Sequence, residues 1–232
     1  MGKLEEGIAQ IGFSGEQAEQ IRHKMDLYIK EIQLFNKTAN LVGTDDYDEL
    51  AVNHVLDSLA GAPHFAALTE KRAREENRRL TAGDFGSGSG FPGLVLASVF
   101  PDIDFVLIER MKKRCTFLEN TAAILALKNV TVLNKDADKV PRESLDIAVF
   151  RAFRPLTSEM TQTIFSALKT HGVVMAYKAK SEKIAEEMAG ITKLVPSFQK
   201  IALTVPFLTE NTAEVRERNL VIFPKHAVPV SF

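Results

Sequence analysis

The chain has few of the residues that would cross-link it or carry it into a membrane. Cys115 is its only cysteine, which excludes an internal disulfide and a zinc site made of several cysteines. No apolar run approaches the length of a bilayer span, and Glu5 and Glu6 follow Lys3 too soon for a signal peptide. We therefore predict a cytoplasmic protein with no metal site and no membrane partner.

The chain also lacks an excess of charge of either sign. Its 232 residues include 29 Lys and Arg and 30 Asp and Glu, a formal net charge of −1. A nucleic acid would therefore have to bind at local basic clusters, although each such cluster is more often a solvated surface. The candidate clusters are residues 71–74 with Arg78 and Arg79, residues 112–114, Arg151 with Arg154, and Lys178 with Lys180.

The most informative segment is 84–93, which reads Asp-Phe-Gly-Ser-Gly-Ser-Gly-Phe-Pro-Gly. A short strand is expected before it, and Pro92 fits the first position of a helix after it. Gly86, Gly88 and Gly90 allow a sharp turn and a close approach to a ligand at the free N–H groups of that helix.

An acid follows at the end of the next expected strand. Glu109 lies 23 residues (109 − 86) after Gly86, a spacing typical of a carboxylate that binds ribose hydroxyls. The strand, turn, helix, second strand and acid occur in the order typical of a site for a nucleotide-bearing cofactor.

Asp84 bears on which cofactor this is. An acid two residues before Gly86, followed by alternating glycines, resembles the first motif of S-adenosylmethionine-dependent methyltransferases. A carboxylate here would repel a pyrophosphate but hold a sulfonium or an amino group directly or through water. A turn-capping role is the alternative for Asp84. No Tyr-x-x-x-Lys follows any of the tyrosines, which weakens the alternative of a nucleotide-binding dehydrogenase.

Hydrophobic periodicity predicts an α/β protein in two parts. Residues 1–77 are expected to form an N-terminal helical extension, with one long helix from Ser14 to Phe35 and another from Thr44 to Leu59, before Pro63. The charged segment 70–79 is expected to be a solvated helix or a linker.

In residues 78–232, strands and helices alternate, which predicts a Rossmann-like, mostly parallel sheet with helices on both faces. Pro155 fits the start of a helix, and His171-Gly172 fits its end. An antiparallel hairpin is expected at the end of the chain, from segments 198–207 and 218–223. The predicted parallel strands are 80–85, 104–109, 129–133, 145–150 and 172–178, and the helices between them are near 92–99, 110–127, 155–170 and 181–191.

Several motifs point together to one family. They are Asn36 with Asn40-Leu41, residues 54–59 (His-Val-Leu-Asp-Ser-Leu), residues 84–93, Glu109 with Lys112-Lys113 and Phe117-Leu118, Asn129-Val130, Arg151-Ala152, and Lys178. With these motifs the sequence resembles the bacterial 16S rRNA guanine-N7 methyltransferase family (RsmG, also called glucose-inhibited division protein B). Two places depart from the family pattern: Asn53 stands where Arg is usual, and residues 135–138 lack the Arg followed shortly by Glu. The resemblance assigns no role to Asn53 or Lys135.

The resemblance implies a class I methyltransferase fold, S-adenosylmethionine as cofactor, and 16S rRNA of the 30S subunit as partner. Phe91, Ala137, Asp138 and Arg151 are assigned to the cofactor by resemblance alone. Phe91 is equally a candidate for a hydrophobic staple beside Pro92, and Arg151 for a surface ion pair. The full predicted cofactor set is Asp84, Gly86, Ser87, Gly88, Gly90, Phe91, Glu109, Ala137, Asp138 and Arg151.

The implied acceptor, guanine N7, has a free lone pair, so no general base is expected. The predicted catalytic residues, which would position the substrate, are Arg151, Lys178, His54 and Asp57. His54, Asp57 and Ser58 share one helix face and form either a wall of the site or a buried polar network that holds the N-terminal helices. Lys178 is expected to contact phosphate or guanine O6, or to be an ordinary strand-end lysine.

Cys115 is expected to be a core thiol on a helix face with Met111, Leu118, Ala122 and Leu125, which argues against pyrimidine C5 methylation through a thiolate. Two further functions stay open beside the dehydrogenase: a small-molecule methyltransferase and a non-catalytic rRNA-binding assembly factor. A monomer is expected, and the sequence does not distinguish naked rRNA from an assembled subunit as substrate.

Overall fold

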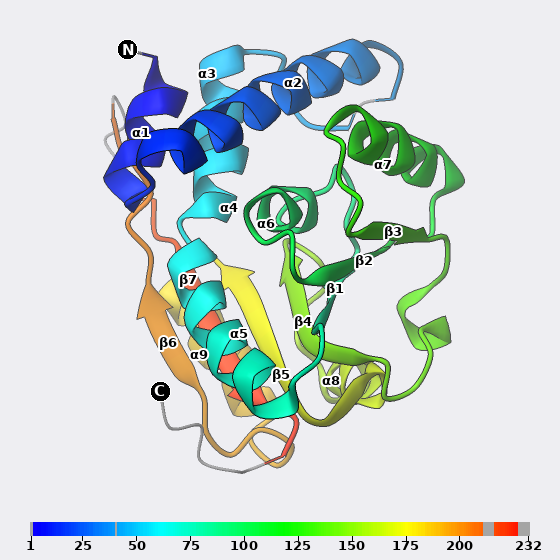
Figure 1. Ribbon diagram of the computed structural model, residues 1–232. Helices are drawn as coiled ribbons and strands as arrows, with labels where there is room; N and C mark the ends of the chain where they lie inside the picture. The colour runs from blue at the N-terminus through cyan, green and yellow to red at the C-terminus, as the bar shows by residue number, and fades with distance from the viewer. Residues whose placement is uncertain (1, 40, 211–215, 227–232) are drawn as a thin grey trace.

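The computed structural model describes residues 2–39, 41–210 and 216–226 (Figure 1). In this part of the chain, seven strands form one sheet in the order β3-β2-β1-β4-β5-β7-β6. The strands are β1 (Thr81–Phe85), β2 (Asp104–Ile108), β3 (Val130–Leu133), β4 (Leu145–Arg151), β5 (Leu168–Lys178), β6 (Gln199–Ala202) and β7 (Asn219–Pro224). The first five are parallel, whereas β7 is antiparallel to β5 and β6. The predicted Rossmann-like sheet with a terminal hairpin is confirmed.

Helices cover both faces of this sheet (Figure 1). The N-terminal part contains α1 (Lys3–Ile11), α2 (Gly15–Ala39), α3 (Tyr47–Leu50), the π-helix η1 (Ala51–Leu56), α4 (Asp57–Leu59) and α5 (Ala62–Glu76). The rest contains α6 (Gly93–Val99), α7 (Lys112–Ile124), the short 3₁₀ helix η2 (Ala137–Lys139), α8 (Ser158–Ala167) and α9 (Ser181–Gly190). None of the described helices has the length and apolarity that a membrane span needs.

The central strand β4 shows how the sheet separates two apolar layers. Ile147 and Val149 pack with the N-terminal helices and with α6 and α7, whereas Ala148 and Phe150 pack with α8 and α9. Because successive side chains of a strand point to opposite faces, a continuous apolar run such as 147–150 fits only a strand buried on both sides.

The N-terminal helices share the first of these layers. Met25 and Ile32 of α2 are completely buried in the same cluster as Leu107 of β2. Helix α5 ends at Asn77, whose backbone is left-handed (φ 45°), close to the position where the two parts were expected to meet. The charged segment before Asn77 is therefore helical, and the division into two domains stays a prediction.

Two predicted helices differ from the structure. Helix α8 is capped by Thr157, whose hydroxyl accepts from Met160 N (3.2 Å), so Pro155 precedes the helix and does not begin it. His171 and Gly172 belong to β5 and not to a helix end, because β5 already begins at Leu168, which pairs with Leu145 before a bulge. Strand pairing across the sheet outweighs the local signals here.

The helix predicted from Thr44 is the second difference. Asp46 caps it, accepting from Glu49 N (2.8 Å), and the π-helix η1 separates α3 from α4. Pro63 lies in the first turn of the next helix, α5. Within the predicted Asn36 motif, Asn40 lies outside the described residues, while the Asn36 amide donates to Asp45 (2.7 Å).

Candidate functional site

Two cavities adjoin at the carboxyl edge of the sheet, on either side of the point where β1 and β4 are neighbours and the strand order reverses. The glycine-loop cavity, of about 630 Å³, is bordered by Gly86, Glu109, Arg114, Lys135, Ala137 and Asp138 among others. The arginine cavity, of about 650 Å³, is bordered by Asn53, His54, Asp57, Arg151, Tyr177, Lys178, Arg216 and Arg218 among others. Residues 152–155 border both cavities and form the wall between them.

The glycine loop connects β1 to α6. Its glycines 86, 88 and 90 all have positive φ angles, of 68°, 57° and 95°. At Gly88 an added Cβ would meet nothing closer than 3.7 Å, so the left-handed backbone and not crowding favours glycine there. The open side of Gly88 is where a ligand can approach the backbone.

Glu109 lies beside this loop, directly after β2. Its carboxylate accepts from the backbone N–H groups of Gly88 (3.0 Å) and Met111 (2.8 Å), and its side chain is 5% exposed. A carboxylate has about four lone pairs, so two bonds leave capacity for the hydroxyls of a ribose.

Asp84 is buried under the start of α6, with 1% of its surface exposed. One carboxyl oxygen accepts from Gly93 N (3.1 Å), as the turn-capping interpretation expects, and the other has no partner. Burial raises the pKa of Asp84 to about 7, although the hydrogen bond from Gly93 N opposes this rise. A buried acid with a free oxygen fits a cationic ligand nearby.

The other predicted cofactor residues divide into two groups. Ala137 and Asp138 lie in η2 and border the glycine-loop cavity. Phe91 borders neither cavity and is buried between Tyr28 and His54, with ring centroids 5.0 Å from each. Ser87 is also buried, and its hydroxyl donates to Asp84 O (2.9 Å).

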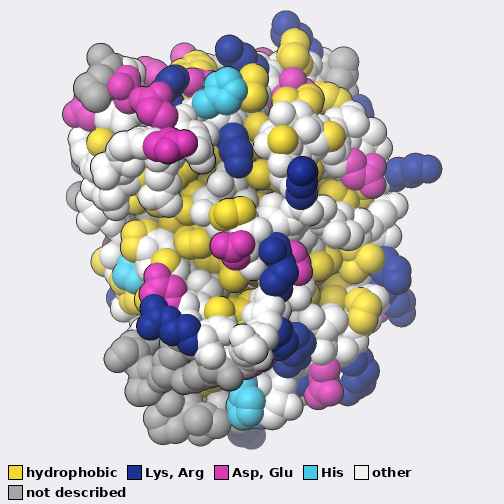
Figure 2. All heavy atoms as spheres, viewed as in Figure 1, with side chains coloured by type: hydrophobic (Ala, Val, Ile, Leu, Met, Phe, Trp, Pro, Cys, Tyr) yellow, Lys and Arg dark blue, Asp and Glu magenta, His cyan; other side chains and the backbone are white. Residues whose placement is uncertain are grey.

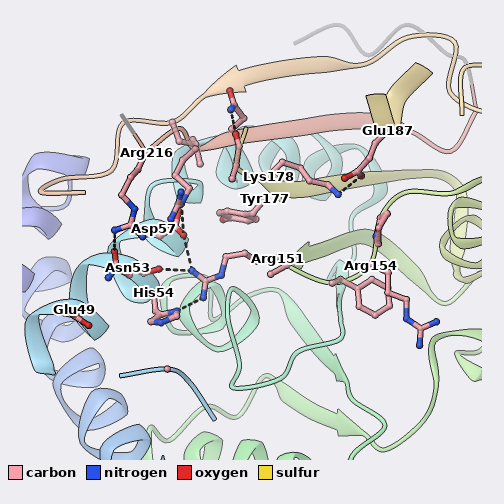
Figure 3. Close-up of a pocket in the computed structure, with 18 of the residues that line it drawn as sticks. Glu49, Asn53, His54, Asp57, Arg151, Arg154, Tyr177, Lys178, Glu187 and Arg216 are labelled. Atoms are coloured by element: carbon pink, nitrogen blue, oxygen red, sulfur yellow. Dashed lines mark hydrogen bonds and ion pairs between the residues drawn. The ribbon is translucent and has the colours of Figure 1, made fainter. Parts of the chain in front are cut away.

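Arg151, the last residue of β4, is the centre of the arginine cavity (Figure 3). Its guanidinium donates to Asp57 Oδ2 (2.9 Å) and to the carbonyl of Asn53 (3.0 Å), and it lies 2.8 Å from His54 Nδ1. The same guanidinium lies over the Phe91 ring, 4.9 Å from its centroid. The structure thus joins three predicted residues, His54, Asp57 and Arg151, in one cluster.

His54 is a neutral member of this cluster. Burial, followed by the charges of Arg151 and Arg218, lowers its pKa to about 4. Because a guanidinium can only donate, Nδ1 accepts from Arg151 and the ring proton resides on Nε2.

Asp57 also accepts a hydrogen bond from a second arginine, Arg218, which directly precedes β7. Arg218 Nε donates to the same Oδ2 atom (3.1 Å), while Oδ1 of Asp57 is buried and has no partner. Ser58 does not border the cavity: its hydroxyl donates to His54 O (2.7 Å), and its carbonyl accepts from Tyr177 (2.9 Å). The cluster therefore joins the N-terminal helices to the sheet as well as bordering the cavity.

Lys178, at the end of β5, is an ion-paired lysine. Its ammonium is 2.6 Å from Glu187 Oε2, and this oxygen also accepts from the backbone N of Leu156 (3.0 Å). Glu187 therefore holds the lysine and the end of the 152–155 wall in place (Figure 3).

The wall itself has an unusual backbone. Ala152 has a φ of 50°, a conformation that non-glycine residues rarely adopt and that recurs at functional sites. The Phe153 ring lies against Gly86, where an added Cβ would collide with it. Arg154 is exposed and borders both cavities.

Some residues of the arginine cavity were not among the predicted site residues. Arg216 donates to the Asn53 side chain (2.9 Å), which places a guanidinium next to the position where the family pattern has Arg. Arg218 lies within the predicted segment 218–223, but no local pattern relates it to Asp57. Glu187 lies on α9 without any motif.

Two arginines of one predicted basic cluster, Arg78 and Arg79, do not border either cavity. Arg78 binds Asp146 (2.8 Å) and Arg79 binds Asp104 (2.9 Å), at the amino ends of the strands. On the face shown in Figure 2, lysines and arginines are scattered among acidic side chains. Cys115 is buried as predicted, and burial raises the pKa of its thiol, but Met111 precedes the helix and is exposed.

The strand order, the glycine loop and the acid after β2 define an S-adenosylmethionine-dependent methyltransferase. Solved structures share this fold: a tRNA (m1A58) methyltransferase from Aquifex aeolicus has a TM-score of 0.53 and 15% identity over 72% of this chain and 70% of that one. A SAM-dependent methyltransferase from the same organism has a TM-score of 0.51 and 16% identity, covering 78% of this chain and 95% of that one.

The family follows from sequence comparison. The profile described as rRNA small subunit methyltransferase G (GidB) matches residues 21–221. A ribosomal RNA small subunit methyltransferase G from Treponema denticola is 35% identical over 97% of this chain and 94% of its own length. One from Borrelia turicatae is 34% identical, covering 87% of this chain and 89% of its own length. This chain belongs to the rRNA small subunit methyltransferase G family, which favours a methyltransferase over the dehydrogenase and the non-catalytic binding protein.

Proposed function

We propose that this enzyme transfers a methyl group from S-adenosylmethionine to N7 of a guanine in 16S rRNA of the small ribosomal subunit. The supporting observation is the pair of adjoining cavities: Gly86 of the glycine loop and Glu109 border one, and several guanidinium groups border the other. Only residues 152–155 separate them. The names of the relatives supply the class of RNA, and the resemblance of the sequence motifs supplies the N7 position.

The glycine-loop cavity fits the cofactor, which supplies an electrophilic methyl group on a sulfonium when bound. We assign Glu109 to the ribose hydroxyls and the open backbone at Gly88 to the methionine part. The free oxygen of Asp84 favours the cationic end of the ligand, because a nearby positive charge stabilises the ionised carboxylate. Ala137 and Asp138 also border this cavity and complete the set.

The arginine cavity fits one nucleotide turned out of its stack, since its volume of about 650 Å³ lies within the usual range of ligand sites. Arg154 and Arg216 are exposed at this cavity and suit RNA phosphates. Arg151 and Arg218 are pre-oriented by Asp57, so they can offer donors to guanine O6 without losing much side-chain entropy. Lys178, paired with Glu187, adds a further cation at the edge.

Catalysis in this arrangement depends on orientation. The N7 lone pair attacks without loss of a proton, so no side chain has to act as a general base. His54 is not available as a base, because its Nδ1 already accepts a hydrogen bond from Arg151. Residues 152–155, which border both cavities, would orient the base toward the cofactor and exclude water.

The test is methyl transfer to 30S subunits with labelled S-adenosylmethionine. N7 methylation gives the base a fixed positive charge, so borohydride and aniline should cleave the 16S rRNA at one position. Cleavage should require cofactor and should be lost in Gly88→Val, whose branched side chain occupies the ligand's approach. A label confined to an exocyclic amine or to a C5 position would contradict the N7 assignment.

We also infer that residues 1–77 form an extension of a methyltransferase domain at 78–232 and that the enzyme acts in the cytoplasm as a monomer. Light scattering after size exclusion tests the monomer, and cell fractionation tests the location.

A further inference from the structure

The glycine loop is held by a residue from outside the sheet. Tyr28 lies on α2 and is completely buried, and its hydroxyl donates to the backbone carbonyl of Ser89. Ser89 lies between Gly88 and Gly90, and the two partners are 61 residues apart in the sequence. A helix of the N-terminal part therefore determines the position of a peptide group inside the cofactor loop.

The loop backbone is shaped around this tyrosine. An added Cβ at Gly90 would lie 2.6 Å from the Tyr28 hydroxyl oxygen, so glycine at position 90 makes room for the hydroxyl. The tyrosine ring also packs on Phe91, with centroids 5.0 Å apart. One side chain thus contacts three consecutive residues of the loop, 89–91.

Further hydrogen bonds of the loop link the part that contacts Tyr28 to Gly88 and Glu109. Gly90 N donates to Ser87 O (2.6 Å), and Gly90 O accepts from Leu94 N (2.8 Å), which fixes the loop to the start of α6. Gly88 N in turn donates to Glu109 (3.0 Å). If the Ser89 peptide rotated, the open side of Gly88 and the Glu109 carboxylate would no longer face the same ligand.

We propose that Tyr28 is a positioning residue for S-adenosylmethionine, which makes α2 a part of the cofactor site. Tyr28 does not touch the cofactor. It selects the loop conformation in which Gly88 and Glu109 face the ligand together. This inference depends on the cofactor and is independent of which RNA base accepts the methyl group.

Tyr28→Phe tests it, because this change removes the hydroxyl and keeps the ring on Phe91. We expect the Kd for S-adenosylmethionine, measured by titration calorimetry, to rise about 3- to 10-fold, the effect of one hydrogen bond. At saturating cofactor, kcat should stay within about two-fold of the unchanged protein, so that the loss appears in KM. Hydrogen exchange of residues 86–91 should become faster.

Two matched variants serve as controls. Tyr47→Phe removes a hydroxyl that donates to Asp26, on the same helix as Tyr28. Tyr177→Phe removes a buried hydroxyl that donates to the carbonyl of Ser58 (2.9 Å). Both should lower Tm and leave the cofactor Kd within about two-fold, since neither hydroxyl reaches the loop.

Two outcomes overturn the proposal. In the first, Tyr28→Phe lowers Tm but binds cofactor as tightly as the unchanged protein, which reduces Tyr28 to a structural role. In the second, a control variant loses as much cofactor affinity as Tyr28→Phe. Methylation of a base other than guanine, or at an atom other than N7, would contradict the proposed function and leave this inference intact.

Discussion

Two buried aspartates lie at opposite ends of the same sheet, and each binds two cations. Asp146, at the amino end of β4, is 2% exposed and accepts from Arg78, Lys169 and the backbone N of Thr81. Both of its oxygens are engaged, because Arg78 reaches Oδ1 as well as Oδ2. No cavity of the described site borders it.

Asp57 lies near the carboxyl end of β4 and differs from Asp146 in how many of its carboxylate oxygens have a partner. It is 3% exposed and binds Arg151 and Arg218 through one oxygen, while the other has no partner. Burial without full satisfaction costs stability, so a protein retains such a group chiefly where it serves a site. The pairing of acid with arginine does not distinguish the two ends; the unpartnered oxygen and the adjoining cavity do.

The largest effect on stability is expected from Asp146→Asn. The substitution breaks a buried charge network and should cost roughly 3 kcal/mol of the free energy of unfolding at neutral pH, with cofactor affinity unchanged. Burial opposes ionisation of Asp146, but hydrogen bonds from Arg78, Thr81 N and Lys169 outweigh it and lower its pKa. A lowered pKa stabilises the fold above the unfolded value of 3.8, so the difference between variant and unchanged protein should shrink as pH falls below it.

Urea unfolding at neutral and acidic pH measures this effect. Asp104→Asn is the control, because its ion pair with Arg79 lies at the same edge but is half exposed and should be worth less than about 1 kcal/mol. Equal costs for the two variants would remove the distinction between a buried network and a surface pair.

Asp57→Asn should show the opposite balance. Its arginines border a cavity that water can enter, so we expect a loss of about 1–2 kcal/mol in stability. Methyl transfer to 30S subunits should fall roughly 10- to 100-fold, because Arg151 and Arg218 lose the charge that orients them. A variant as unstable as Asp146→Asn but with normal kcat/KM would show that the Asp57 cluster only holds the helices together.

Asp84, like Asp57, has an unpartnered oxygen, so the pH dependence of stability should distinguish it from the fully bonded Asp146. Its pKa is raised to about 7, so its contribution to stability is complete below the unfolded value of 3.8 and is lost as pH rises through about 7. Relative to the unchanged protein, Asp84→Asn should therefore gain stability as pH rises from about 4 to about 7, with little further change above pH 7. The same variant should bind S-adenosylmethionine more weakly.

Thermal unfolding across this pH range, without cofactor, tests the sign. A variant that loses stability with rising pH, relative to the unchanged protein, would mean that Asp84 is ionised and well paired like Asp146. Cofactor affinity of the unchanged protein should fall below about pH 7, and Asp84→Asn should lack this dependence.

The smallest effect concerns RNA binding at the arginine cavity. Arg216→Ala should weaken RNA association a few-fold and reduce the slope of log K against log salt by about 1, as the loss of one phosphate contact does. Arg74→Ala is the control, since Arg74 is exposed on α5 and pairs only loosely with Glu70 (3.5 Å). Filter binding at several salt concentrations gives both slopes. A slope for Arg216→Ala equal to that of the unchanged protein would exclude Arg216 from the RNA-binding surface.

The sequence predicts the glycine loop and the acid after β2 because these signals are local. The glycines of 86–90, the strand before them and the acid at 109 all lie within one β-α-β unit, whose spacing is set by the fold. The arginine cavity is different. Arg218 and Asp57 are 161 positions apart and meet only because β7 inserts beside β5. Neither hydrophobic periodicity nor a local motif can predict a contact between residues so far apart in the sequence.

The boundary between α8 and β5 is a second feature that depends on contacts between distant parts of the chain. The segment near 168–170 continues a helical pattern, but its pairing with β4 makes it a strand. Similarly, nothing in residues 51–56 predicts a π-helix, because the wide turn depends on how the segment packs against α1 and α2.

That π-helix has a consequence for how this chain can change in length. A π-turn contains one residue more than the α-turn it replaces, and each residue rotates a helix by about 100°. Removal of one residue from η1 would restore a regular helix and swing Asp57 and Ser58 away from Arg151 and Tyr177, although every side chain of the cluster would still be present. A single-codon deletion within 51–56 should therefore abolish methyl transfer while a helix forms, whereas a deletion before Asp46 should leave the rotation of Asp57 about the helix axis unchanged. A set of single-residue deletions along 41–59, assayed for activity and helicity, would reveal this difference.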